Sequence, residues 1–189
     1  MSLQKLLHDQ NLSVYRLSQL TGIPYSTLND LKNDKKKVED CSVKIVVRLA
    51  DIFHMTTDEI IFYLDTQRPS FDNFRSDICH KVRSYGDMPF VEWIESKDTI
   101  RLYYKKGWKE EAFYLLAMTD YLRRIHNLST NPKYDALRKE KLPSPVYPTG
   151  LKLLAIAKNN PQILKNAKYD AIPEFIRFNI VENDIRNSI

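Results

Sequence analysis

The stretch that decides the fold of the N-terminal part is Leu12–Asp34, LSVYRLSQLTGIPYSTLNDLKND. Ser13 suits the N-cap of a first helix, and residues 21–24, TGIP, have the composition of a turn. A second helix is predicted from Tyr25 to about Lys32. The apolar residues of the segment recur at helical spacing; they are Leu17, Leu20, Ile23, Leu28 and Leu31. The pattern predicts two short helices that pack across a tight turn.

Three positions make this pair of helices specific. Ser18 is a small residue where the helices must cross closely, and Gly22 stands where the turn needs a positive φ. Leu28 is the apolar residue that packs the second helix on the first. The segment therefore resembles the helix-turn-helix of the lambda-repressor-like (Cro/CI, XRE) family, and residues 49–60 resemble its closing helices. The resemblance implies an all-α domain of five helices over residues 1–65.

The resemblance also implies which residues meet DNA. The helix that begins at Tyr25 would lie in the major groove as the recognition helix. The base-facing candidates are Tyr25, Ser26, Asn29 and Asp30. Ser26 can donate or accept a hydrogen bond, and Asp30 can accept from a cytosine amino group. The phosphate-contacting candidates follow the helix; they are Lys32, Asn33, Lys35, Lys36 and Lys37.

Each of these roles has an alternative. The three consecutive lysines could form a solvated loop, Asp30 could pair with Lys32 or Lys35, and Tyr25 could pack over the preceding helix. Two residues depart from the family pattern. Pro24 occupies the usual serine or threonine N-cap position, and Asp34 replaces a common glycine after the recognition helix. The course of the lysine loop therefore stays open at this point.

Charge is unevenly distributed along the chain. The net charge is +5 over 189 residues, but residues 1–64 carry eight basic and eight acidic residues and sum to zero. Total charge therefore does not locate a DNA-binding surface. The chain has two cysteines and no export signal or apolar run of about 20 residues, so we expect a reduced, cytoplasmic protein that does not span a membrane.

The rest of the chain predicts a second, α+β domain over residues 72–189. Residues 66–70, TQRPS, have the composition of a linker. Helices are expected at 73–84, 109–125, 150–158 and within 173–189, with a loop-rich stretch at 132–148. Residues 90–95 and 99–104 predict a β-hairpin because they are rich in aromatic and β-branched residues. Four aromatic residues near it could pack in the core, bind nucleic acid or meet a partner protein; they are Trp93, Tyr103, Tyr104 and Trp108.

No pattern typical of an enzyme, cofactor site or metal site occurs. The four glycines are too scattered for a phosphate-binding loop, and the four histidines and two cysteines lack zinc-ligand spacing. We therefore expect a sequence-specific transcriptional regulator, most simply a repressor, that binds double-stranded DNA as a homodimer. The alternative is an antitoxin-type protein that autoregulates its operon and neutralises a protein partner through its C-terminal domain.

Overall fold

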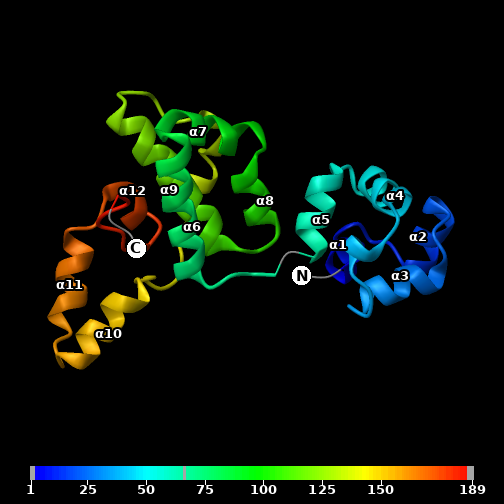
Figure 1. Cartoon of the computed structure of the whole chain (residues 1–189), viewed down its shortest axis with the longest axis horizontal. Helices are drawn as coiled ribbons and strands as arrows, with labels where there is room; N and C mark the ends of the chain where they lie inside the picture. Colours follow the sequence, from blue (N-terminus) through cyan, green and yellow to red (C-terminus); the bar gives the residue numbers. More distant parts are fainter. Residues whose placement is uncertain (1–2, 66, 187–189) are drawn as a thin grey trace. The chain divides into compact units, whose positions relative to one another are not determined.

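The computed structural model describes residues 3–65 and 67–186. Contacts divide the chain into two compact units, Met1–Arg68 and Pro69–Ile189 (Figure 1). The division falls inside the segment expected to link two domains, of which Thr66 lies outside the described residues. Which role each unit has remains a prediction.

The N-terminal unit is all-α, as the sequence predicts. Its helices are α1 (Leu3–Asp9), α2 (Val14–Thr21), α3 (Tyr25–Lys32), α4 (Val43–Phe53) and α5 (Thr57–Asp65), with a 3₁₀ turn at Val38–Asp40 between α3 and α4. One core joins them, and its fully buried members include Leu3, Leu17, Leu28, Leu49 and Ile60.

Side-chain caps define where two of these helices begin. The Ser13 hydroxyl accepts from the Arg16 backbone N–H at 3.1 Å, as expected for the N-cap of α2. At α5 the cap is Thr56. Thr56 accepts from the Glu59 N–H at 3.2 Å, and Glu59 accepts in return from the Thr56 N–H at 2.7 Å. This reciprocal pair is a capping box, which requires the glutamate three residues after the cap.

The C-terminal unit is built around one central helix. Helices α6 (Phe71–Tyr85), α7 (Asp87–Ser96), α8 (Thr99–Lys105) and α12 (Pro173–Ile176) pack around α9 (Lys109–Ile125) (Figure 1). Every residue from 111 to 120 in α9 is buried. Two 3₁₀ turns, Pro132–Tyr134 and Leu137–Lys139, lie in the long connection to α10 (Thr149–Ala157), which α11 (Gln162–Tyr169) follows.

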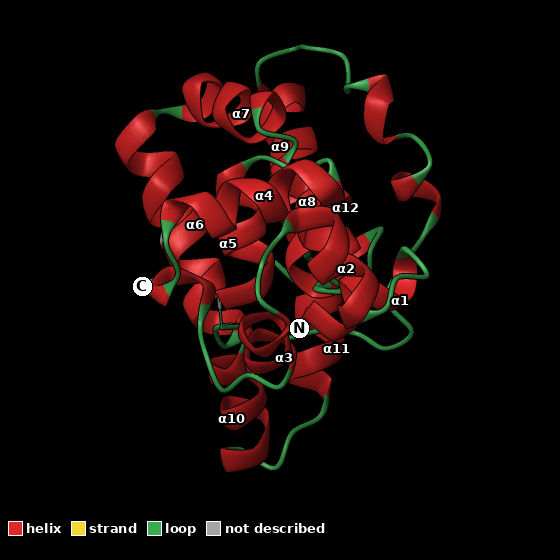
Figure 2. Ribbon diagram, turned by 90° about the vertical axis from the view of Figure 1, so that its right-hand side faces the viewer, coloured by secondary structure: helices red, strands yellow, loops and turns green. Residues whose placement is uncertain are grey.

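The predicted β-hairpin is wrong. Residues 90–95 lie in α7 and residues 99–104 in α8, and the described residues contain only one isolated β-bridge, Val146 with Ile180 (Figure 2). Phe90, Val91 and Ile94 are all fully buried, which is the spacing of one helical face and not the alternation of a strand. Packing against α9 thus outweighs the β propensity of aromatic and branched residues.

The aromatic residues near the expected hairpin belong to the core of the C-terminal unit. Trp108 is 6% exposed, and the rings of Tyr103 and Trp108 meet edge to face with centroids 5.6 Å apart. Trp93, Tyr103 and Tyr104 are partly buried against the same core. Their arrangement favours core packing over nucleic-acid stacking.

The end of the chain also differs from the prediction. Only Pro173–Ile176 is helical, and residues 177–186 follow an irregular path; residues 187–189 of the expected helix lie outside the described residues. An ion pair fixes this path, because Glu182 accepts from Arg75 of α6 through both carboxylate oxygens. The Tyr114 hydroxyl donates to Glu182 at 3.0 Å. Burial, with Glu182 beside it, raises the pKa of Tyr114 well above its usual value, so Tyr114 keeps the proton that it donates.

Candidate nucleic-acid interface

The turn between α2 and α3 has the geometry that the sequence pattern requires. Gly22 has φ +64°, and its N–H donates to the Ser18 carbonyl at 2.8 Å. The Ser18 hydroxyl donates to the Ile23 carbonyl at 2.6 Å. Ser18 is therefore more than a small residue at the crossing, because its hydroxyl also holds the turn together.

Two further residues stabilise this turn and were not singled out in the sequence. The Thr21 hydroxyl donates to the Leu17 carbonyl at 2.7 Å and accepts from the Ile23 N–H at 3.2 Å. Arg48 of α4 donates to the Gly22 carbonyl at 3.4 Å. Arg48 is distant in sequence, so only the tertiary structure could reveal it. Together these bonds fix the angle at which α3 leaves α2.

Helix α3 has one buried face and one accessible face. Leu28 and Leu31 are at most 4% exposed and face the core. The four base-facing candidates lie at i, i+1, i+4 and i+5, which is a single helical face; they are Tyr25, Ser26, Asn29 and Asp30. Tyr25 is 53% exposed, Ser26 is exposed, and Asn29 and Asp30 are half-buried. Among the described residues no salt bridge involves Asp30, so neither Lys32 nor Lys35 neutralises its carboxylate.

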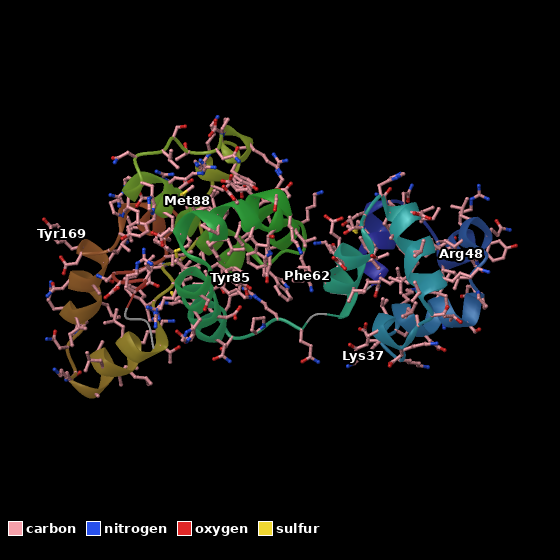
Figure 3. The ribbon with its side chains drawn as sticks, turned by 45° about the horizontal axis from the view of Figure 1, so that its top comes forward. Lys37, Arg48, Phe62, Tyr85, Met88 and Tyr169 are labelled. Carbon is pink, nitrogen blue, oxygen red and sulfur yellow. The ribbon has the colours of Figure 1, made fainter. Side chains whose placement is uncertain are left out.

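The loop after α3 follows a defined course. Asp34 has φ +55°, so it adopts the left-handed conformation for which glycine is common at this position. The backbone N–H of Lys35 then donates to the Asp30 carbonyl at 2.9 Å, which ties the loop to the end of α3. Lys37 pairs with Glu39 at 2.9 Å, and both side chains are more than half exposed. Figure 3 shows Lys37 at the surface of the N-terminal unit.

Pro24 is the N-cap of α3, with φ −53° and ψ 137°, and it offers no side-chain acceptor. The first turn of α3 therefore carries backbone N–H groups that its cap does not satisfy. These groups, and the positive end of the helix dipole, lie beside Tyr25 and Ser26.

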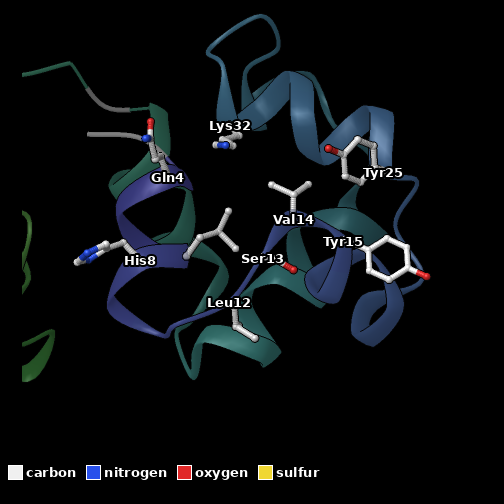
Figure 4. Close-up of a pocket in the computed structure, with 9 residues that line it drawn as sticks. Gln4, His8, Leu12, Ser13, Val14, Tyr15, Tyr25 and Lys32 are labelled. Atoms are coloured by element: carbon white, nitrogen blue, oxygen red, sulfur yellow. The ribbon is translucent and has the colours of Figure 1, made fainter.

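A hollow of about 400 Å³ is lined by α1, the start of α2 and α3. Tyr25 and Lys32 line it from α3, and Ser13 and Tyr15 line it from the α2 side (Figure 4). Because Tyr25 and Lys32 border the same hollow, a base-facing candidate and a phosphate-facing candidate lie along one continuous surface.

Comparison with known families agrees with this geometry. Residues 2–65 match the model of the Cro/C1-type HTH DNA-binding domain. The N-terminal unit is a Cro/C1-type domain. The match supports DNA binding and transcriptional regulation through the N-terminal unit. Neither the curated proteins nor the solved structures contain a match to this chain. Outside the Cro/C1-type domain, the C-terminal unit is unrecognised.

Across residues 3–65 and 67–186, no group of three or more His, Cys, Asp or Glu side chains is placed to hold a metal ion. None of the described helices is long and apolar enough to cross a bilayer. The expectation that the chain uses no metal, cofactor or catalytic residues remains a prediction.

Proposed function

We propose that this protein is a sequence-specific repressor that reads its operator with α3. The observation that carries the proposal is the accessible face of α3 inside a Cro/C1-type domain. That face presents a phenol, a hydroxyl, an amide and a carboxylate, which offer both donors and acceptors to base edges in the major groove. The opposite face of α3 is bound into the core, so the helix enters the groove as a rigid element.

The lysine loop supports the same orientation. Lys32, Lys35 and Lys36 follow the base-facing residues directly, and no salt bridge neutralises them among the described residues. Uncompensated lysines beside a recognition helix are suited to contact backbone phosphates. Asp30, whose carboxylate forms no salt bridge among the described residues, would accept a hydrogen bond from a cytosine amino group.

We further propose that the protein binds as a homodimer. Operators of helix-turn-helix proteins are two-fold, with half-sites about 34 Å apart, and a two-fold operator requires a two-fold protein.

The test is DNA binding across a salt series with fragments of the protein's own promoter. We expect the wild type to bind one fragment far more tightly than competitor DNA. The triple variant Tyr25→Ala, Ser26→Ala, Asp30→Ala loses that preference while its circular dichroism is unchanged. Lys35→Ala, Lys36→Ala instead weakens binding to all fragments and lowers the salt slope by about 2.

The matched control is Gln10→Ala, Asp51→Ala, which removes exposed side chains of the same unit outside α3 and the lysine loop. It should bind as the wild type does. Equal, weak binding of wild type and triple variant to every fragment would reduce the domain to a non-specific DNA anchor and refute the proposal.

A second candidate function is that of an antitoxin-type regulator, which also masks a protein partner. One observation favours it. The helical hairpin α10–α11 of the C-terminal unit exposes large apolar side chains, including Leu153 at 60% and Ile156 at 74%. Exposed apolar surface of this kind marks contact with another macromolecule.

A further inference from the structure

Almost all side chains of the α10–α11 hairpin (residues 149–170) are exposed or only partly buried. Ala155 is its only buried residue, and α11 has none. In Figure 1 the two helices extend away from the α6–α9 bundle of the same unit. A pair of helices this short is not stable through local hydrogen bonds alone and needs an apolar face packed on something.

Helix α10 is apolar around nearly its whole circumference. Its sequence, TGLKLLAIA, has one charged residue, Lys152. Leu153 and Ala157 lie one turn apart on the face opposite Ala155, with Leu154 and Ile156 beside them. A helix that is apolar all round is normally buried, yet these three large side chains are 43–74% exposed. Figure 3 shows Tyr169, 90% exposed, on α11.

The hairpin is nevertheless held in place at both ends. The Thr149 backbone N–H donates to Asp72 of α6 at 3.1 Å, and the Thr149 hydroxyl donates to the same carboxylate. At the other helix, the Asn183 side-chain amide donates to the Ala167 carbonyl at 3.0 Å. The apolar face is therefore presented on an anchored element, which lowers the entropy cost of binding.

The charges of the hairpin identify the kind of partner. Residues 149–170 contain four lysines and one aspartate, Asp170. The lysines are all exposed, and none forms a salt bridge among the described residues; they are Lys152, Lys158, Lys165 and Lys168. Elsewhere in the same unit several carboxylates pair with arginines, as in Glu95 with Arg123 at 2.6 Å and Asp120 with Arg138 at 2.7 Å.

We propose that the hairpin docks a different protein, through an apolar helix or groove flanked by carboxylates. Leu153, Leu154 and Ile156 would form the centre of the contact, and the lysines would form its charged rim. A hollow of about 530 Å³ between α10 and α11, lined by Ala155, Ile156 and Leu164, has room for an apolar side chain of the partner. This proposal rests on the second candidate function and names its surface and the chemistry of its partner.

Two other occupants fit less well. A second copy of the hairpin would bring eight lysines together with only two aspartates. DNA phosphates would meet the lysines but leave the three large apolar side chains in water. An anionic membrane would meet both the lysines and the apolar side chains, so the test includes vesicles.

The probes are three fluorescent 18-residue helical peptides with the same leucine face, flanked by glutamate, glutamine or lysine. Fluorescence anisotropy with the full-length protein should show the glutamate peptide binding at least tenfold more tightly than the lysine peptide, with the glutamine peptide between them. Leu153→Ser, Ile156→Ser should weaken binding of the glutamate peptide at least tenfold. Lys165→Glu, Lys168→Glu should reverse the order of the peptides.

The matched controls change similar residues elsewhere in the unit. Leu128→Ser removes an exposed leucine (45%), and Lys141→Glu reverses an exposed lysine; neither should alter peptide binding. Because the substituted side chains are exposed, circular dichroism and the Tm should stay at the wild-type values. Specific DNA binding by the hairpin variants should also be unchanged. Loss of promoter binding would therefore count against the proposed DNA-binding function, and loss of peptide binding against the docking surface.

Several results would overturn the proposal. One is the absence of binding to any peptide, or equal binding to all three. Another is a wild-type dimer, seen by sedimentation, that Leu153→Ser, Ile156→Ser dissociates, which would assign the face to a second copy. Tighter binding to phosphatidylserine vesicles than to the glutamate peptide, lost in the same variant, would assign it to a membrane. A salt slope for DNA reduced by Lys165→Glu, Lys168→Glu would assign it to DNA.

Discussion

The two units use charged side chains differently. Around α3 the lysines that follow the recognition helix have exposed or half-exposed side chains, and Lys32, Lys35 and Lys36 have no salt bridge within the described part of the chain. In the body of the C-terminal unit, several ion pairs include a buried partner, as in Glu182 (1% exposed) with Arg75 (16%). Paired charge there holds the fold, whereas the unpaired lysines after α3 are proposed to contact DNA. The α10–α11 hairpin resembles the surface beside α3, because its four lysines form no salt bridge among the described residues.

The largest change in stability is expected when Glu182 is replaced. Glu182→Ala removes the carboxylate to which the Arg75 guanidinium and the Tyr114 hydroxyl donate, so we expect the C-terminal unit to lose about 3–5 kcal/mol of unfolding free energy. Chemical denaturation followed by tryptophan fluorescence measures it, because Trp93 and Trp108 both lie in this unit. Glu92→Ala, at an exposed position, should change stability by no more than about 0.5 kcal/mol. Equal losses in the two variants would contradict a structural role for the pair.

A pair of leucine substitutions compares α3 with α10. Leu28 is 0% exposed, so Leu28→Ala should cost about 2–5 kcal/mol through lost burial and a cavity. Leu153 is 60% exposed, and Leu153→Ala should stay within about 0.5 kcal/mol of wild type in the isolated protein. Thermal unfolding followed by circular dichroism measures both. A large loss for Leu153→Ala would show that α10 is packed in the free protein, and the interpretation of its exposed face would then fail.

The smallest of these stability effects is expected at the turn that orients α3. Gly22→Ala places a Cβ on a residue with φ +64°, and that Cβ would lie 3.4 Å from the Arg48 guanidinium. We expect a loss of about 1–2 kcal/mol, due mainly to the left-handed conformation. Gly150→Ala, in α10 with open space around its Cβ, is the matched control and should be neutral or stabilising. A neutral Gly22→Ala would mean that the turn relaxes, and DNA affinity would report whether α3 moves with it.

Local pattern was sufficient to predict the N-terminal unit. Ser18, Gly22 and Leu28 act within one turn, and their geometry depends on neighbours close in sequence, so spacing alone identified the helix-turn-helix and its accessible face. The same reasoning was wrong at residues 90–104, where aromatic and branched residues favour strands but contacts with the distant helix α9 make them helices. It also missed α11, whose eight residues follow Pro161 and have no buried member.

What the sequence by itself determined is therefore the Cro/C1-type domain and its helix-turn-helix, whereas the DNA contacts of α3 and of the lysine loop remain predictions. Only the tertiary structure decided what the C-terminal unit presents. The sequence predicted an apolar helix near residues 150–158, and such a helix is normally buried. Its exposure depends on where the rest of the unit packs, because burial is a property of contacts between distant segments and not of the spacing of residues along one helix.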